Sequence, residues 1–193
     1  MATEVSICSN ALRRLGDSPI TSLTEDSERG RLCNAFYEPS RDAILRSHTW
    51  NFAINRANLA KLSTSPAFEY ANQFALPTDP FCLRVLKMEF EDYEFKIENL
   101  AEQGRVLLTD EGEAKIIYIA RVTDPSLFDS MFVDVLTAKL AVDLAYPVTN
   151  STTLQVQMQK LFERKLSEAR SLDSTEGSTD SLISTVFTDF RAP

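Results

Sequence analysis

The spacing of apolar residues changes twice along this chain of 193 residues. In residues 1–53 and again in residues 123–173, apolar side chains recur every three or four positions, as on one face of a helix. Residues 54–122 instead hold short β-rich runs separated by prolines. The pattern predicts an α+β, mainly α fold: a bundle of about four helices, built from 1–53 and 123–173, with an inserted antiparallel β-sheet at 54–122.

Caps and breakers give the expected bounds of the first two helices. The first covers about residues 3–15, because Gly16 and the following Pro19 end its apolar stripe. Ser22 and Glu25 have capping-box spacing, so we expect the second helix to begin there and to run to Trp50. Pro39 lies inside this helix and predicts a kink near residues 35–38.

The third helix is apolar on almost all sides, which predicts that it lies at the centre of the bundle. It is expected to open at Asp124-Pro125 and to end at Pro147. Asn150 or Ser151 would then cap a fourth helix that runs antiparallel to the third and continues to about Leu172.

The insertion contains four candidate strands, at residues 81–90, 94–100, 105–110 and 115–122. An antiparallel meander is their simplest pairing, with turns at 103–104 and 111–112. Apolar residues follow one another without alternation at 106–108 and at 116–119, so both faces of the sheet are expected to be covered, by the helices or by another subunit.

The last twenty residues change composition again. Residues 173–181 are small and polar and predict no packed core, yet large apolar residues follow them. We interpret residues 174–193 as an extended C-terminal arm that docks on a partner; the alternative is that it folds back on its own subunit. The residues expected to dock are Leu182, Ile183, Val186, Phe187, Phe190 and Arg191.

Catalytic motifs are absent from the sequence. There is one histidine, and there is no glycine-rich phosphate loop, GxSxG or HExxH motif, so we predict no enzyme, no cofactor and no metal site. His48 with Asp42 suggests acid–base chemistry, but an imidazole that packs beside Trp50 at a helix end is the favoured interpretation. The three scattered cysteines, Cys8, Cys33 and Cys82, are predicted to be reduced and buried.

Charge bounds the possible partners. Lysine and arginine total 20 against 28 aspartate and glutamate, and the net charge of −8 argues against tight binding of phosphate backbones. No stretch approaches the roughly 18 apolar residues of a membrane span and no signal peptide is visible, so we expect a soluble chain made in the cytoplasm that binds no membrane.

Arginines are concentrated in the first fifty residues, where they could contact nucleic acid or an acidic partner. Interleaved carboxylates predict local salt bridges instead. These arginines are Arg13, Arg14, Arg29, Arg31, Arg41 and Arg46.

One run of residues carries a family resemblance. Residues 41–53, RDAILRSHTWNFA, followed by RANL at 56–59, are similar to the signature of bacteriophage head-to-tail adaptor proteins, the family that includes tail tubular protein A of short-tailed phages. Three further segments agree in order: ALRRLG at 11–16, PITSL at 19–23, and FALPTD at 74–79 before LRV at 83–85. The resemblance covers nearly the whole chain.

The resemblance implies a structural virion protein without catalytic activity. Twelve copies would form a ring fastened to the portal protein ring, and this dodecamer would extend the DNA channel toward the tail. The other partners would be a tail tube or nozzle protein and double-stranded DNA, which would pass without sequence-specific binding. The protein would be made in the host bacterial cytoplasm and reside in the virion, at the neck.

The resemblance also implies roles for parts of the chain. The bundle would form the ring body, the β insertion would face the tail component, and the arm would reach along the portal. We interpret His48, Trp50, Asn51 and Phe52 as a structural anchor where the long helix meets the insertion. Two alternatives remain: another neck or tail-completion protein, such as a terminator ring, and an enzyme or host-directed regulator.

Overall fold

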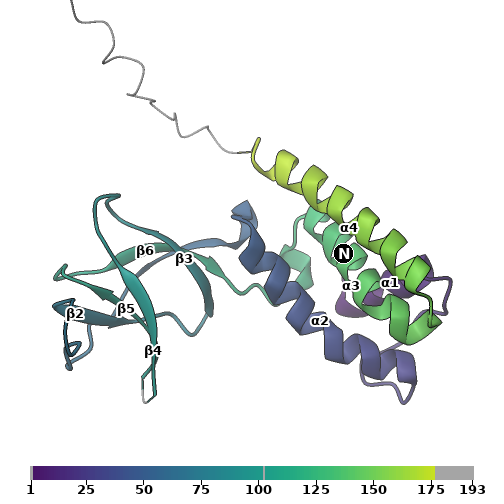
Figure 1. Ribbon diagram of the computed structural model, residues 1–193, viewed down its shortest axis with the longest axis horizontal. Coiled ribbons are helices and arrows are strands. Elements are labelled where there is room, and N and C mark those ends of the chain that lie inside the picture. Colours follow the sequence, from purple (N-terminus) through teal and green to yellow (C-terminus); the bar gives the residue numbers. More distant parts are fainter. Residues whose placement is uncertain (1, 102, 177–193) are drawn as a thin grey trace, which may run out of the picture.

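A computed structural model describes residues 2–101 and 103–176 of the chain. The helices form one end of the molecule and the strands form the other (Figure 1). The predicted α+β, mainly α class is confirmed. The predicted docking arm lies outside the described residues from position 177 onward.

Four helices build the bundle: α1 (Glu4–Arg14), α2 (Glu28–Ser47), α3 (Ser130–Thr149) and α4 (Thr152–Asp173). As predicted, α3 is the central element: it packs against the other three, and about half of its residues are buried. α4 lies alongside α3 and buries fully only Ala169, so most of its surface stays accessible (Figure 1). A helix with apolar residues on all sides needs neighbours on all sides, which explains why α3 organises the core.

The bounds of α1 agree with the prediction, whereas the start of α2 does not. Gly16 takes a left-handed φ of 78° just after α1, as expected for a helix-ending glycine. Ser27, and not Ser22, is the N-cap of α2. The Glu25 carboxylate accepts hydrogen bonds from the Thr21 backbone N–H (2.7 Å) and the Ser27 hydroxyl (2.6 Å), so it closes a turn before the helix. α2 then runs through Pro39 without interruption.

The third helix begins later and ends later than predicted. Asp124 caps only a short 3-10 turn at Pro125–Leu127, and Asp129 caps α3 itself. Pro147 lies within the last turn, where its fixed φ still suits a helix. Asn150, with a left-handed φ of 52°, ends α3, and the Ser151 side chain caps α4.

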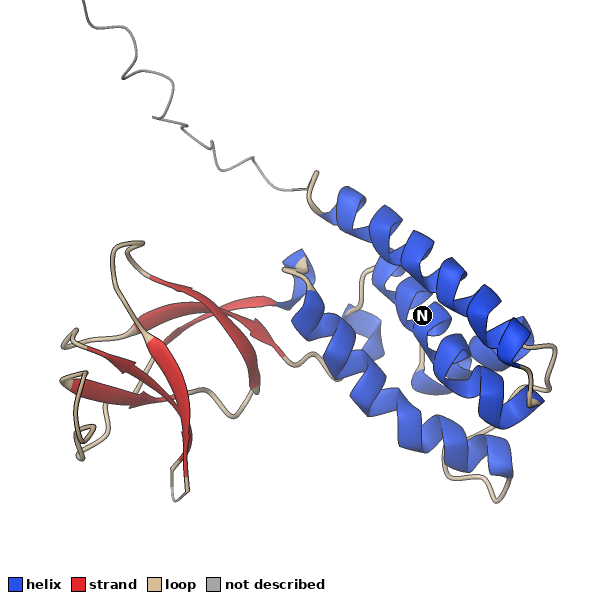
Figure 2. Ribbon diagram, in the orientation of Figure 1, coloured by secondary structure: helices blue, strands red, loops and turns tan. Residues whose placement is uncertain are grey.

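Six strands form two antiparallel sheets of three strands each (Figure 2). The first sheet has the order β1 (Ile54–Asn58), β6 (Lys115–Ala120), β3 (Cys82–Met88). The second has the order β2 (Asn72–Ala75), β5 (Gly104–Thr109), β4 (Lys96–Leu100).

The predicted meander is wrong. It requires β3–β4, β4–β5 and β5–β6 pairs, and of these only β4–β5 is hydrogen-bonded. After β5 the chain crosses to the other sheet, where β6 pairs with β1 and β3. Side chains from both sheets then share one core, which includes Phe74, Met88, Leu107 and Ile116. The non-alternating apolar runs are therefore covered largely by the opposite sheet, not by a single layer of helices.

The bundle and the first sheet also share apolar packing. Leu83 of β3 and Ile119 of β6 belong to the bundle core. The Arg46 guanidinium donates to the Leu83 carbonyl, and Arg121 Nε lies 2.7 Å from an Asp42 carboxylate oxygen. Apolar packing and polar contacts thus join α2 to those ends of β3 and β6 that lie nearest the bundle.

Candidate functional site at the helix–sheet junction

The four predicted anchor residues meet where α2 gives way to β1. The backbone turns extended at His48, and the Trp50 side chain enters the bundle core, where it is fully buried. Trp50 Nε1 donates to the Ile44 carbonyl oxygen at 3.0 Å, which satisfies its one polar atom. Its ring packs edge-to-face on His48 (centroids 4.8 Å apart), and Phe52 packs on Phe132 of α3 (5.0 Å).

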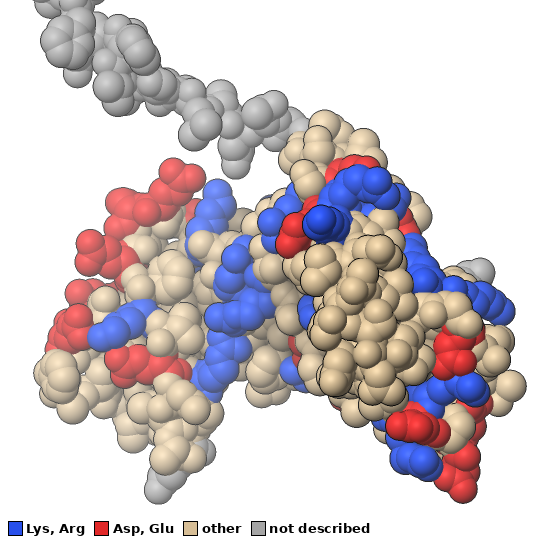
Figure 3. All heavy atoms as spheres, turned by 45° about the vertical axis from the view of Figure 1, so that its right-hand side comes forward, with Lys and Arg blue, Asp and Glu red and all other residues tan. Residues whose placement is uncertain are grey.

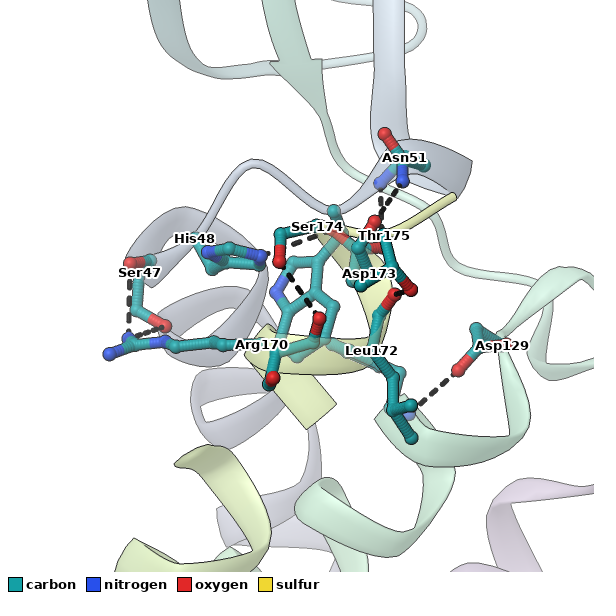
Figure 4. Close-up of polar contacts among 12 residues, drawn as sticks. Ser47, His48, Asn51, Asp129, Arg170, Leu172, Asp173, Ser174 and Thr175 are labelled. Carbon is teal, nitrogen blue, oxygen red and sulfur yellow. Dashed lines mark hydrogen bonds and ion pairs between the residues drawn. The ribbon is translucent and has the colours of Figure 1, made fainter. Parts of the chain in front are cut away.

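Asp173, the last residue of α4, ties that helix to the same junction (Figure 4). Its carboxylate accepts the Asn51 backbone N–H at 3.1 Å and lies 3.1 Å from His48 Nε2. The Asn51 side-chain amide donates to the Asp173 carbonyl oxygen at 2.7 Å. Asp173 was not predicted as part of this site, because in the sequence it opens the polar segment 173–181.

His48 and Asp42, the candidate acid–base pair, are not brought together. Asp42 instead accepts from Arg41 Nε (2.9 Å) and pairs with Arg121. Burial lowers the pKa of His48; Asp173 opposes this shift, and the charges of Arg170 and Arg84 reinforce it. His48 is thus a packed imidazole held against Trp50, as the favoured interpretation expected.

Four arginines from four elements surround this junction: Arg46 (α2), Arg84 (β3), Arg105 (β5) and Arg170 (α4), here called the arginine cluster. Arg46, Arg84 and Arg105 line a groove of about 390 Å³ together with Val85, Ile97, Glu98 and Asn99. Arg170 donates to the Ser47 carbonyl at 3.2 Å, one residue from His48 (Figure 4). Figure 3 shows basic side chains gathered between the bundle and the sheets.

The arginine cluster has no carboxylate partners among residues 2–101 and 103–176. Arg46 and Arg105 each donate to a backbone carbonyl instead, of Leu83 and Cys82 respectively. A neutral carbonyl satisfies a donor but leaves the positive charge uncompensated.

Most of the other early arginines form the salt bridges that the sequence predicted. Arg13 is the exception, because it donates to the Asn10 side chain. The pairs are Arg14–Asp134, Arg29–Asp17, Arg31–Asp26 and Arg41–Asp42.

Carboxylates gather at the other end of the sheets, in the loops at residues 89–95 and 110–114, here called the acidic tip (Figure 3). Partial burial, followed by the charges of Glu111, Asp92 and Glu89, raises the pKa of Tyr93. Phe90 packs on Tyr93 with centroids 5.1 Å apart but stays 52% exposed. An exposed aromatic ring surrounded by charge is typical of a protein interaction surface.

Neither a metal centre nor a membrane helix is found in the described parts of the chain. Among those residues, no group of three histidine, cysteine, aspartate or glutamate side chains is placed to hold an ion. No described helix is both long and apolar enough to cross a bilayer. Cys8, Cys33 and Cys82 are free and buried, as predicted.

Comparison with known proteins adds no relative: no family model and no curated protein matches this chain. The predicted docking residues, Leu182, Ile183, Val186, Phe187, Phe190 and Arg191, lie outside the described residues.

Proposed function

We propose that this protein is a head-to-tail adaptor, a structural virion protein that forms a ring between the portal and the tail and extends the DNA channel. The observation that carries the proposal is the junction. The run that resembles the adaptor signature, residues 41–53, places Trp50 in the bundle core and Asn51 against Asp173. The signature therefore fixes the end of α4, which is the root of the predicted arm.

The accessible surface of α4 also supports assembly. Val156 and Leu172 on this helix are 56% and 53% exposed, although both are apolar. A ring subunit needs contact surfaces on both flanks, since each copy binds two neighbours through different patches. A helix with one face on α3 and apolar residues on its accessible side fits one such flank.

The charge of the chain fits a conduit for DNA. A net charge of −8 disfavours trapping of phosphates by lysine and arginine, so double-stranded DNA would pass through the ring without adhering. The tail-side partner would be a tail tube or nozzle protein, contacted by the sheets.

Binding to the portal tests the role of the arm. We expect a variant lacking residues 174–193 to lose co-sedimentation with portal rings, because the apolar docking residues are removed. A full-length variant with Leu182, Ile183, Val186, Phe187 and Phe190 changed to serine should behave like the truncation. Undiminished binding by both variants would remove the arm from the proposal.

Electron microscopy of the protein mixed with portal rings tests the proposal as a whole. A head-to-tail adaptor should appear as a second ring stacked on the portal with matched symmetry. A ring that binds only the end of a tail tube would instead identify a tail-completion protein, and a lone particle beside the portal would reject both assignments.

A further inference from the structure

We propose that the arginine cluster of one copy binds the acidic tip of a neighbouring copy, so that this contact joins adjacent subunits. The inference rests on the proposed ring, and it names the surfaces that hold the ring together. The two surfaces carry opposite charge and differ in place, as a head-to-tail contact between identical subunits requires.

The arginine cluster forms no salt bridge among the described residues, although Glu98, which pairs with Lys96, lines the same groove. The carbonyl bonds of Arg46 and Arg105 orient these guanidinium groups without neutralising them. In addition, the Nε atoms of Arg84 and Arg170 are buried and have no hydrogen-bond partner in the described part of the protein. These two buried atoms are closed to a second molecule, whereas the guanidinium groups of Arg46, Arg84 and Arg105 line the groove, where a carboxylate would accept charge-assisted hydrogen bonds.

The acidic tip supplies such carboxylates together with an apolar contact. Asp92, Glu94 and Glu113 are exposed and form no ion pair within the described ranges. Phe90 stands among them, and the groove offers it apolar walls in Val85 and Ile97. Charge and an aromatic anchor thus occur on the same surface, as in many specific protein contacts.

The tip of one copy cannot reach the cluster of the same copy. β3 links the two surfaces, because it carries Arg84 of the cluster and leads into the tip loop at Glu89. These two residues are five positions apart, at most about 17 Å at the usual rise per residue of a strand. β3 is paired with β6 along this length, with register shifts between Cys82 and Arg84 and between Val85 and Lys87, and this pairing holds the two surfaces apart. The contact is therefore one between two molecules.

A second copy fits the groove better than DNA does. Glu98 lines the groove beside the arginines and would repel a phosphate backbone, and the chain as a whole carries a net charge of −8. A short protein loop with a few carboxylates can place them on the arginines and avoid Glu98, whereas a duplex presents phosphates along its whole length.

Two charge-reversed variants test the contact. The cluster variant carries Arg46→Glu and Arg84→Glu, and the tip variant carries Asp92→Arg and Glu94→Arg, both on exposed loop positions. Arg31→Glu, at an exposed pair far from the cluster, is the matched control. Circular dichroism establishes that each variant is folded, and sedimentation velocity at low salt measures self-association of the full chain.

We expect the wild-type and control proteins to self-associate reversibly, and the dissociation constant of each reversed variant to rise by about tenfold or more. An equimolar mixture of the two reversed variants should associate again, because each then offers its partner a complementary surface. Wild-type protein that stays monomeric at low salt, or a mixture that stays as weak as its components, would overturn the inference. The tip variant alone keeps the test valid if the cluster variant fails to fold, since it must weaken association by itself.

A further measurement tests whether duplex DNA, instead of a second copy, occupies the groove. Fluorescence anisotropy with a short labelled duplex should show no tight binding by the wild type; binding that the cluster variant alone abolishes would assign the groove to DNA and overturn the inference. Failure of this contact can be distinguished from failure of the proposed function. Portal-bound rings that both reversed variants form as well as the wild type would reject the contact but keep the adaptor function. Self-association of the protein without any portal-bound ring would reject the adaptor function but keep the contact.

Discussion

At the scale of single residues, Trp50 joins α2 to α3, because its nitrogen bonds to Ile44 and its ring contacts His48 at the end of α2 and Phe132 of α3. Replacing it with alanine removes a fully buried ring, so we expect Trp50→Ala to lower the free energy of unfolding by about 3–5 kcal/mol. Urea denaturation followed by circular dichroism measures the change. Trp50→Phe, which keeps a ring but loses the Ile44 bond, is the milder control.

One experimental outcome would contradict the anchor role of Trp50. If Trp50→Ala abolished portal binding while the free energy of unfolding stayed unchanged, this residue would be part of a binding surface and not of the core.

His48 gives a second prediction at this scale, and it is the single histidine of the chain. Because the folded state lowers its pKa below the ordinary value of 6.5, the unfolded state binds more protons as the pH falls. The free energy of unfolding should therefore decrease as the pH drops through 6.5 toward the lowered pKa, and this contribution should level off below it.

NMR titration of the imidazole measures this pKa directly. Asp173→Asn removes the charge that favours the protonated ring, so the variant should lower the pKa of His48 further. An unchanged or higher pKa in the variant would contradict the assigned contact. His48→Gln is the control for the pH dependence of stability, which should lose the His48 contribution.

At the scale of elements, the turn before α2 depends on Gly30. A Cβ atom at this position would lie 2.7 Å from Glu25 Cγ and 2.8 Å from the Glu25 carbonyl oxygen. The turn would have to shift, so we expect Gly30→Ala to destabilise the protein by about 1–3 kcal/mol. Thermal denaturation of both variants measures the change. Gly112→Ala, where no atom lies within 4 Å of the added carbon, is the control and should change stability by less than about 0.5 kcal/mol.

The same turn shows why the start of α2 was mispredicted. The spacing of Ser22 and Glu25 correctly indicates a side chain that bonds back to the backbone, and bonds from Ser27, Thr21 and Ser22 lower the pKa of Glu25 to about 2. A capping-box pattern reports this local hydrogen bonding, but the helix begins only where the backbone N–H groups align, after Ser27. The local sequence pattern therefore predicts the position of the turn but not the residue at which α2 begins.

Helices were more predictable than strand pairing for a physical reason. The apolar stripe and caps of α1 and α4 lie within each helix, so their residues alone specify them. Pairing of β6 with β1 joins Ile119 to Ile54, which are far apart in the chain, and no local signal encodes that choice. The arginine cluster was missed for the same reason, since its members come from four separate elements.

At the scale of the whole molecule, the two sheets should differ in stability. Leu83 and Ile119 tie the β1-β6-β3 sheet to the bundle core. The β2-β5-β4 sheet contributes buried residues only to the core between the two sheets. Native-state hydrogen exchange should show β4 and β2 opening at lower free energy than β6. Equal opening energies for all three strands would mean that the molecule unfolds as one unit.

The junction also has a practical consequence for optical work. Trp50 is the only tryptophan in the chain, and its indole packs edge-to-face against the His48 imidazole. Fluorescence excited selectively at tryptophan therefore reports a single location, where the bundle, the first sheet and the end of α4 meet. Binding of a partner that changes the surroundings of Trp50 would therefore change the fluorescence of the protein, and no added dye is needed to measure it.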